Sequence, residues 1–286
     1  MTAFTGATYT RRSEVTTEMI ALGFGAKRVQ QIAVVEMEGT IGPRLRAADY
    51  AKLLRSLAEN DRVRSVVLDI DSPGGSATAS NFLHLSVQAL ARKKPVVAFI
   101  RGTGASGAYL FACAAQKIVA IPSALIGSIG VISMRPLLYE AMDRLSLKMS
   151  VTKSDKFKDM GSMFRPPTPE EQQKEQELVD DLYEQFLEAV MEGRHMDREQ
   201  ARAVATGEVF TARKAKELGL VDELGDLEHA IDLAAELGKT PRRPVWVRPR
   251  RGLRDMLTSL AASSFAAELA GQIEDRLQTR VYYQRL

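Results

Sequence analysis

The stretch VRSVVLDIDSPGGSA, residues 63–77, predicts the fold class of this chain. Its first nine residues form a run rich in β-branched and aliphatic side chains, which is typical of a strand buried on both faces of a parallel sheet. The glycine pair then turns the chain directly into ATASNFLHLSVQALARK, residues 77–93, which we expect to be a helix. A strand, a tight turn and a helix in immediate succession form the building unit of an α/β protein.

Strand and helix patterns alternate on both sides of this stretch. Further strands are expected at residues 30–39 (QQIAVVEMEG), 94–100 (KPVVAFI), 117–122 (KIVAIP) and 148–154 (KMSVTKS). Further helices are expected at residues 46–60, 106–116 and 137–147. This order predicts a parallel sheet of β-α-β units with helices on its faces.

The second half of the chain is mostly helical in its sequence pattern. Residues 167–192 are long, charged and amphipathic, and Thr168 and Glu171 have the spacing of a capping box. Apolar residues recur along this predicted helix at every fourth position, as Leu178, Leu182, Phe186 and Val190. Such a stripe packs on the chain's own sheet, which is the default expectation, or on a neighbouring subunit.

These patterns divide the chain into three parts. Residues 1–28 are expected to form an N-terminal arm, and residues 29–240 one catalytic domain. Residues 241–286 are expected to form a basic C-terminal helical tail, because six arginines lie from Arg242 to Arg254 and apolar residues at helical spacing follow them.

No apolar stretch approaches the roughly 20 residues that cross a bilayer, and no signal-peptide pattern is present. We therefore expect the chain in the cytoplasm or peripherally on a membrane.

The composition excludes several kinds of site. Cys113 is the only cysteine among 286 residues, so neither a disulfide framework nor a cysteine-rich metal site is available. His84, His195 and His229 lack the spacing of metal ligands, and they leave a Ser-His-Asp triad unsupported. A formal net charge of +3 is too small to indicate nucleic-acid binding. We expect no metal site and no nucleic-acid partner.

Three glycine-bearing turns follow predicted strands. They are DSPGGSA at 71–77, RGTGASGAY at 101–109 and GSIGV at 127–131. Loops at the carboxyl ends of neighbouring strands converge on one crevice in an α/β sheet, so these turns are able to share a site. Ser106 lies in the second turn, where a nucleophile would have close backbone approach to a substrate. The alternative is three independent tight turns, with Ser106 placed there for close packing.

As a nucleophile in acyl transfer, Ser106 would require a nearby base and backbone N–H groups directed at the developing oxyanion. The glycines of PGG and Gly107 offer N–H groups with no side chain in the way. Without a suitable histidine, the remaining base is a lysine, which works only in its neutral form. Residues 152–168 contain Lys153, Lys156 and Lys158, and the composition does not choose among them.

Four blocks of the sequence together resemble the signal peptide peptidase A (SppA) family of serine peptidases. The blocks are LDIDSPGGSA (68–77), GTGASGAYLFACAAQKIVAIPSALIGSIGV (102–131), TKSDKFKDMGSMFRPPTPEE (152–171) and GEVFTARKAKELGLVDELG (207–225). They occur in the family's order, and the resemblance covers most of the chain. It implies a ClpP/crotonase-like α/β fold with repeated β-β-α units, and a Ser-Lys catalytic dyad.

The resemblance also implies a role for individual residues. Ser106 corresponds to the nucleophile, Lys158 to the general base, and Ser128 to a hydroxyl that orients the lysine. Ser128 is equally compatible with a purely structural place in its turn. The region of the oxyanion hole is implied to comprise Gly74, Gly75 and Gly107.

Substrates and partners follow from the same resemblance. It implies short, apolar, extended peptides such as remnant signal peptides as substrates, a ring-shaped homo-oligomer, and no metal or cofactor. Members of the family usually carry an N-terminal membrane anchor, and none is expected in this chain, so peripheral membrane association stays open. The alternatives are a crotonase-type acyl-CoA enzyme, whose fold also builds oxyanion holes from glycine turns, and a membrane-surface scaffold acting through the basic tail.

Overall fold

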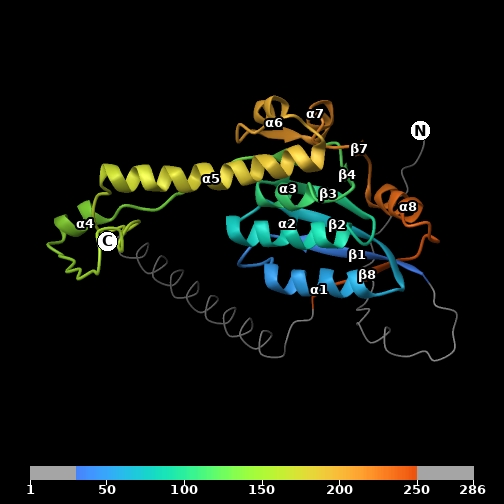
Figure 1. The fold of residues 1–286 in the computed structure, drawn as a ribbon, viewed down its shortest axis with the longest axis horizontal. Helices are drawn as coiled ribbons and strands as arrows, with labels where there is room; N and C mark the ends of the chain where they lie inside the picture. Colours follow the sequence, from blue (N-terminus) through green and yellow to red (C-terminus); the bar gives the residue numbers. More distant parts are fainter. Residues whose placement is uncertain (1–29, 250–286) are drawn as a thin grey trace, which may run out of the picture. The chain divides into compact units, whose positions relative to one another are not determined.

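A computed structural model describes residues 30–249 of the chain, which contain an eight-stranded sheet flanked by helices (Figure 1). The strands are β1 (Gln31–Glu38), β2 (Val63–Ser72), β3 (Val96–Ala105), β4 (Lys117–Ala120), β5 (Leu125–Gly127), β6 (Val209–Thr211), β7 (Glu223–Leu224) and β8 (Pro244–Val247). Their order across the sheet is β6-β5-β3-β2-β1-β8, and β4 pairs with both β3 and β7. Every strand pairing is parallel except that of β5 with β6, so the predicted α/β class is confirmed.

Helices cover both faces of this sheet. The helices of the described residues are α1 (Ala47–Glu59), α2 (Ala77–Ala91), α3 (Gly107–Ala112), α4 (Tyr139–Arg144), α5 (Pro169–Arg194), α6 (Arg198–Val204), α7 (Ala212–Glu217) and α8 (Leu227–Leu237), of which α4 lies away from the sheet (Figure 1). The larger hydrophobic cluster includes side chains of α1, α2, α3 and the second half of α5. A smaller cluster lies between the sheet and α8.

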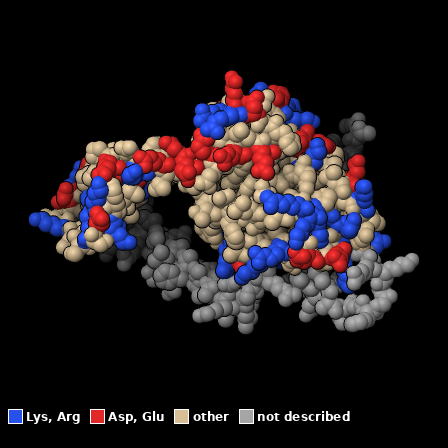
Figure 2. Space-filling view, in the orientation of Figure 1, with Lys and Arg blue, Asp and Glu red and all other residues tan. Residues whose placement is uncertain are grey.

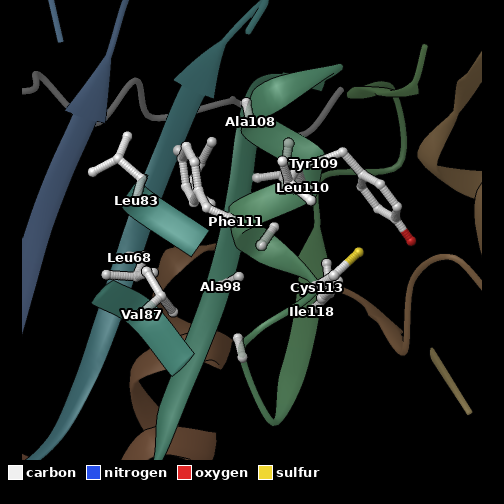
Figure 3. Packing of buried hydrophobic residues seen from close by; sticks show 14 of the residues in the cluster. Leu68, Leu83, Val87, Ala98, Ala108, Tyr109, Leu110, Phe111, Cys113 and Ile118 are labelled. Atoms are coloured by element: carbon white, nitrogen blue, oxygen red, sulfur yellow. The ribbon is translucent and has the colours of Figure 1, made fainter. Parts of the chain in front are cut away.

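The central strand β2 is buried on both faces because its side chains alternate between these two clusters. Val66, Leu68 and Ile70 belong to the larger cluster, whereas Val67 packs in the cluster of α8. Figure 3 shows Leu68 next to Val87 of α2. A parallel strand covered on both faces has a nearly continuous apolar run in its sequence, which is the pattern of residues 63–71.

Strand β3 has β2 on one side and two short strands in succession on the other. Residues 97–100 pair with β4, and residues 103–105 pair with β5. The end of β3 is therefore held between β2 and β5, and Ser106 follows it immediately. The glycine turns that end these three strands lie at one edge of the sheet, as predicted from their order.

Helix α5 confirms the predicted capping box. The Thr168 hydroxyl accepts a hydrogen bond from the Glu171 N–H at 3.2 Å, and the Glu171 carboxylate accepts one from the Thr168 N–H at 2.9 Å. Of the predicted apolar stripe, Phe186 and Val190 are buried in the core, whereas Leu178 is 57% exposed. The second half of α5 thus packs on the chain's own core, and the first half leaves apolar surface uncovered.

One of the two expectations for residues 137–154 is wrong. The predicted helix forms over the shorter range of α4, but no strand forms at residues 148–154. Leu147, Met149 and Val151 alternate with polar residues and so imitate the period of a strand. In the structure these three side chains are about half exposed, and no strand of the described residues pairs with them.

The ends of the chain differ in how far the structure describes them. Residues 244–247, within the predicted tail, form β8 and pair in parallel with β1. The compact unit that contains the sheet runs to Arg248. The predicted arm at residues 1–28 and the helical part of the predicted tail lie outside the described residues. No helix within residues 30–249 is long and apolar enough to span a membrane.

Candidate active site

Ser106 stands at the junction of β3 and α3 in a backbone conformation that is uncommon for a residue with a side chain. Its φ is 53° and its ψ is −126°. The Ser106 N–H donates to the Gly127 carbonyl at 2.8 Å, and the Leu110 N–H donates to the Ser106 carbonyl at 3.0 Å. The half-buried side chain is thus presented on a fixed, strained strand-to-helix turn, which is the geometry of a nucleophile elbow.

Helix α3 is a rigid support for this turn because the core surrounds it. Ala108, Tyr109 and Phe111 are fully buried, and Figure 3 shows α3 packed beside Leu83 and other core side chains. The Tyr109 hydroxyl points away from that cluster and donates to the Leu220 carbonyl at 2.8 Å. Ser106 is therefore carried by a helix that is fixed on several sides.

The turn after β2 packs directly against Ser106. A Cβ on Gly74 would lie 2.8 Å from the Ser106 Cβ and 2.8 Å from the Gly107 nitrogen. A Cβ on Gly75 would lie 2.2 Å from the Ile41 carbonyl oxygen. Neither position has room for a side chain, so the glycine pair is required by close backbone approach. The structure thus brings the three predicted glycines and Ser106 together.

The three glycines differ in the hydrogen bonding of their N–H groups. The Gly74 N–H donates to the Ser72 hydroxyl at 3.2 Å. Within residues 30–249, neither the Gly75 N–H nor the Gly107 N–H donates to a protein acceptor. Gly75 and Gly107 are therefore the candidate donors to an oxyanion, and Gly74 contributes through the absence of a side chain.

The variant Gly107→Ala is expected to lower both activity and stability. A Cβ at this position would lie 2.0 Å from the Oγ of Ser80, a buried residue of α2 that donates to the Ser76 carbonyl at 2.8 Å. Because relief of this clash displaces the turn that carries Ser106, we expect kcat/KM of the reaction at this site to fall at least about tenfold. We also expect a loss of about 1–3 kcal/mol of folding free energy, measured by denaturant unfolding.

Two further variants control for this effect. A Cβ on Gly130 would meet its nearest neighbour at 3.6 Å, an ordinary van der Waals contact, so Gly130→Ala should retain activity. Combining Gly107→Ala with Ser80→Gly removes the clashing atoms and should recover part of the lost activity. Full activity in Gly107→Ala alone would contradict the tight packing of the turn.

Ser128 lies beside Ser106 at the edge of the sheet. Ala105 of β3 is paired with Gly127 of β5, so Ser106 and Ser128 are the next residues along two neighbouring parallel strands. Ser128 has a φ of 50°, and its N–H donates to the Glu208 carbonyl at 2.7 Å. No hydrogen bond joins the two serine hydroxyls in the described part of the chain. Both hydroxyls are nevertheless held at the same edge.

Lys158 lies in another region, in a turn held against the first half of α5. Its side chain is exposed. A Cβ on Gly161, three residues later, would lie 3.9 Å from the Glu175 carboxylate. Phe157 and Met160 line an open hollow of about 340 Å³ together with side chains of α5. The turn of Lys158 is therefore attached to α5.

The surroundings of the three candidate lysines differ. The Lys153 Nζ donates to Asp159 Oδ1 at 2.6 Å, and the Lys156 Nζ donates to Glu170 Oε1 at 2.6 Å. The amino groups of Lys153 and Lys156 are thus each engaged by a carboxylate of the same chain. In residues 30–249, the Lys158 Nζ has neither a hydrogen bond nor an ion pair. This difference favours Lys158 as the base.

The structure does not bring Lys158 to Ser106 of the same chain. Near the other end of α5, Gly193 packs against the Cys113 carbonyl, which follows α3. At about 1.5 Å per residue, α5 rises by about 27 Å from Glu175 to Gly193, whereas Ser106 and Cys113 are only about 10 Å apart along α3. Figure 1 shows α4 and α3 beside opposite halves of α5, and Figure 2 shows an open gap between these regions.

Other reactive side chains are engaged elsewhere. His84 Nδ1 lies 2.8 Å from the Leu110 carbonyl oxygen, and burial lowers the pKa of His84. Burial raises the pKa of the Cys113 thiol to about 12, so this thiol stays protonated and is a poor nucleophile. Among residues 30–249, no group of three or more His, Cys, Asp or Glu side chains is arranged to hold a metal ion.

Comparison with protein families gives two overlapping matches. The model of peptidase family S49 matches residues 88–240, which are more than half of the chain. The Clp protease model matches residues 26–127. Together they cover the three glycine turns and the segment that contains Lys158.

Individual proteins give the same result. A protein of Methanocaldococcus jannaschii that is named as a protease is 39% identical over 188 residues, 66% of this chain and 60% of that protein. The chloroplastic serine protease SPPA of Arabidopsis thaliana is 30% identical over 249 residues, 82% of this chain and 37% of that protein. This chain therefore spans less than two thirds of either relative. These matches confirm the resemblance drawn from the four sequence blocks.

A solved structure shares the fold. A mutant of the 1510-N membrane-bound stomatin-specific protease superposes with a TM-score of 0.51 at 15% identity. The superposition covers 78% of this chain and 99% of that one. The predicted fold class is thus confirmed by a solved protease fold.

Proposed function

Because the chain belongs to peptidase family S49, we propose that it is a serine endopeptidase in which Ser106 attacks the carbonyl carbon of a peptide bond. The observation that carries this proposal is the strained turn of Ser106, which packs against Gly74. The neighbouring residues Gly75 and Gly107 have N–H groups with no protein acceptor in residues 30–249. Gly75 and Gly107 would donate to the oxyanion as it forms.

The proposed reaction uses Lys158 as the base. Neutral Lys158 takes the Ser106 hydroxyl proton as Oγ bonds to the carbonyl carbon, and it returns that proton to the leaving amine as the C–N bond breaks. Water then hydrolyses the acyl-enzyme ester, with Lys158 taking and returning a proton in the same way. Ser128, which directly follows β5 as Ser106 follows β3, would accept a hydrogen bond that orients the lysine.

We further infer that Lys158 serves the Ser106 of a neighbouring copy. The support is geometric, because α5 keeps the Lys158 turn away from Ser106 of its own chain. The segment between β5 and α5 also presents unburied apolar side chains, with Ile132, Met134 and Leu145 at 83%, 87% and 70% exposure. A second copy would cover this surface, and repetition of one head-to-tail contact gives a ring when the rotation between copies closes, as we propose here.

The proposed substrates are short, apolar, extended peptides such as remnant signal peptides. Leu125 lies on β5, which leads to Ser128, and Val209 lies opposite Gly127 on the paired strand β6; the two side chains are 45% and 47% exposed. Exposed apolar side chains beside a catalytic turn suit an apolar peptide. A ring that encloses the Ser106 sites would admit such chains and exclude folded proteins.

Labelling by a serine-directed fluorophosphonate tests the proposed reaction. We expect covalent modification at Ser106, located by mass spectrometry of the digested protein, and none at Ser128. The variant Ser106→Ala should not be labelled, although it keeps the rest of the turn. A crotonase-type acyl-CoA enzyme or a membrane-surface scaffold would not react, so an unlabelled wild-type protein would contradict the peptidase proposal.

A further inference from the structure

We propose that Arg165 is a positioning residue that holds Lys158 in place on α5 for catalysis. This inference rests on the proposed function, in which Lys158 is the base. Arg165 neither takes nor gives a proton in the proposed reaction. It acts through Asp159, the residue that directly follows Lys158 in the chain.

The Arg165 guanidinium binds Asp159 through two parallel hydrogen bonds. Its Nε donates to Asp159 Oδ2 at 2.8 Å, and its Nη2 donates to Asp159 Oδ1 at 2.9 Å. The hydrogen bonds from Arg165 and then from Lys153 hold the pKa of Asp159 well below its usual range. Paired hydrogen bonds of this kind fix geometry as well as charge, so the chain beside Lys158 is fixed to the guanidinium.

The same guanidinium is anchored to the start of α5. Its Nη1 donates to Glu171 Oε2 at 2.8 Å, and its Nη2 also hydrogen-bonds Glu171 Oε1. Glu171 is only 3% exposed and closes the capping box with Thr168. The hydrogen bonds from Arg165 are the largest cause that lowers the pKa of Glu171, to about 2. Arg165 therefore connects the Lys158 turn to a buried, charged point on α5.

The far end of α5 is fixed to the region that carries the nucleophile. The Arg194 Nη1 donates to Asp222 Oδ2 at 2.9 Å, and Gly193 packs against the residue that follows α3. Because α5 is one continuous helix, the Arg165 contacts determine where Lys158 lies relative to this core. Misplacement of a catalytic group by about 1 Å costs up to about a hundredfold in rate. A single exposed ion pair would contribute little, but this one is bidentate and partly buried.

The first test compares Arg165→Gln with Arg198→Gln in peptide hydrolysis. Arg198 also pairs with α5, through Glu184, and serves as the matched control. We expect Arg165→Gln to lower kcat about ten- to a hundredfold with KM changed less than about twofold, and Arg198→Gln to change neither. Arg165→Lys keeps the charge without the paired geometry and should recover part of kcat. An unchanged kcat in Arg165→Gln overturns the proposal.

The second test separates positioning from loss of folding. In a mixture of Ser106→Ala and Lys158→Ala chains, the proposed function assigns the active lysine to the Ser106→Ala chain. Adding Arg165→Gln to that chain should lower the restored activity, whereas adding it to the Lys158→Ala chain should not. An equal loss from either placement overturns the proposal, because it would reflect a general structural defect.

Failure of the proposed function would look different. If Ser106→Ala and Lys158→Ala are each inactive and their mixture also stays inactive, the active site is not shared between copies. The kcat and KM of Arg165→Gln then decide whether Arg165 positions Lys158. If Lys158→Ala is fully active, Lys158 is not the base and the inference falls with it. Should Arg165→Gln fail to fold, Asp159→Asn replaces it, with the same expected fall in kcat at constant KM.

Discussion

The variants Ser106→Ala and Lys158→Ala are each expected to lower kcat/KM for peptide hydrolysis at least about a thousandfold. Ser106→Ala removes the atom that forms the acyl-enzyme. Lys158→Ala leaves the Ser106 hydroxyl without a base, and within residues 30–249 no histidine is placed to substitute for it. Because the two residues act as one unit, the double variant should be little worse than either single variant.

The other two lysines of the same segment are the controls for this prediction. Lys156→Ala removes a hydrogen bond to Glu170, and Lys153→Ala removes one of the two side chains bound to Asp159. Both variants should retain most of the activity, because neither lysine is the proposed base. Full activity in Lys158→Ala, or inactivity of all three lysine variants, would contradict the assignment of Lys158. Thermal unfolding of each variant separates loss of chemistry from loss of fold.

Much of the fold could be predicted because local and tertiary preferences agree. Residues 63–71 are largely apolar on both faces of a strand, and the strand β2 that they form is covered on both faces. The capping box of Thr168 and Glu171 forms as predicted, since it needs only contacts within one helical turn. The strand predicted at residues 148–154 does not form, because here the local pattern and the tertiary structure disagree. Alternation of apolar and polar residues supports a strand only where another strand is available to pair. Strand β8 was missed because its residues PVWV lie among the arginines and prolines of 241–251, where the basic composition indicated a tail.

The site could be predicted in part. The glycine turns and Ser106 share one sheet edge because chain order places them there, and this needs no side-chain detail. Which glycine N–H groups are free does not follow from the sequence, since it depends on the bond from Gly74 to Ser72. The separation of Lys158 from Ser106 is set by the length and anchoring of α5. Arg165 lies within the sequence block 152–171, but its role was not predicted. The pairing of its guanidinium with Asp159 and Glu171, which would have indicated that role, becomes visible only in the structure.

Mixing the two inactive variants Ser106→Ala and Lys158→Ala is expected to restore peptidase activity. Each proposed site takes its serine from one chain and its lysine from the next. Random assembly of equal amounts then gives an intact pair in about one quarter of the sites of a head-to-tail ring, and so about one quarter of wild-type activity. The measurement is peptide hydrolysis by the purified mixed assembly after co-expression of differently tagged chains.

The dependence on mixing ratio makes this test specific. When an active site needs one intact residue from each kind of chain, the restored activity follows the product of the two chain fractions and is greatest at equal amounts. Residual activity of one variant would instead rise linearly with that variant's fraction. A mixture of Ser106→Ala with the Ser106→Ala, Lys158→Ala double variant contains no serine donor and should stay inactive. If the mixed assembly forms but no ratio restores activity, both catalytic residues must come from one chain, and α5 would have to release the Lys158 turn from the position it holds in the structure.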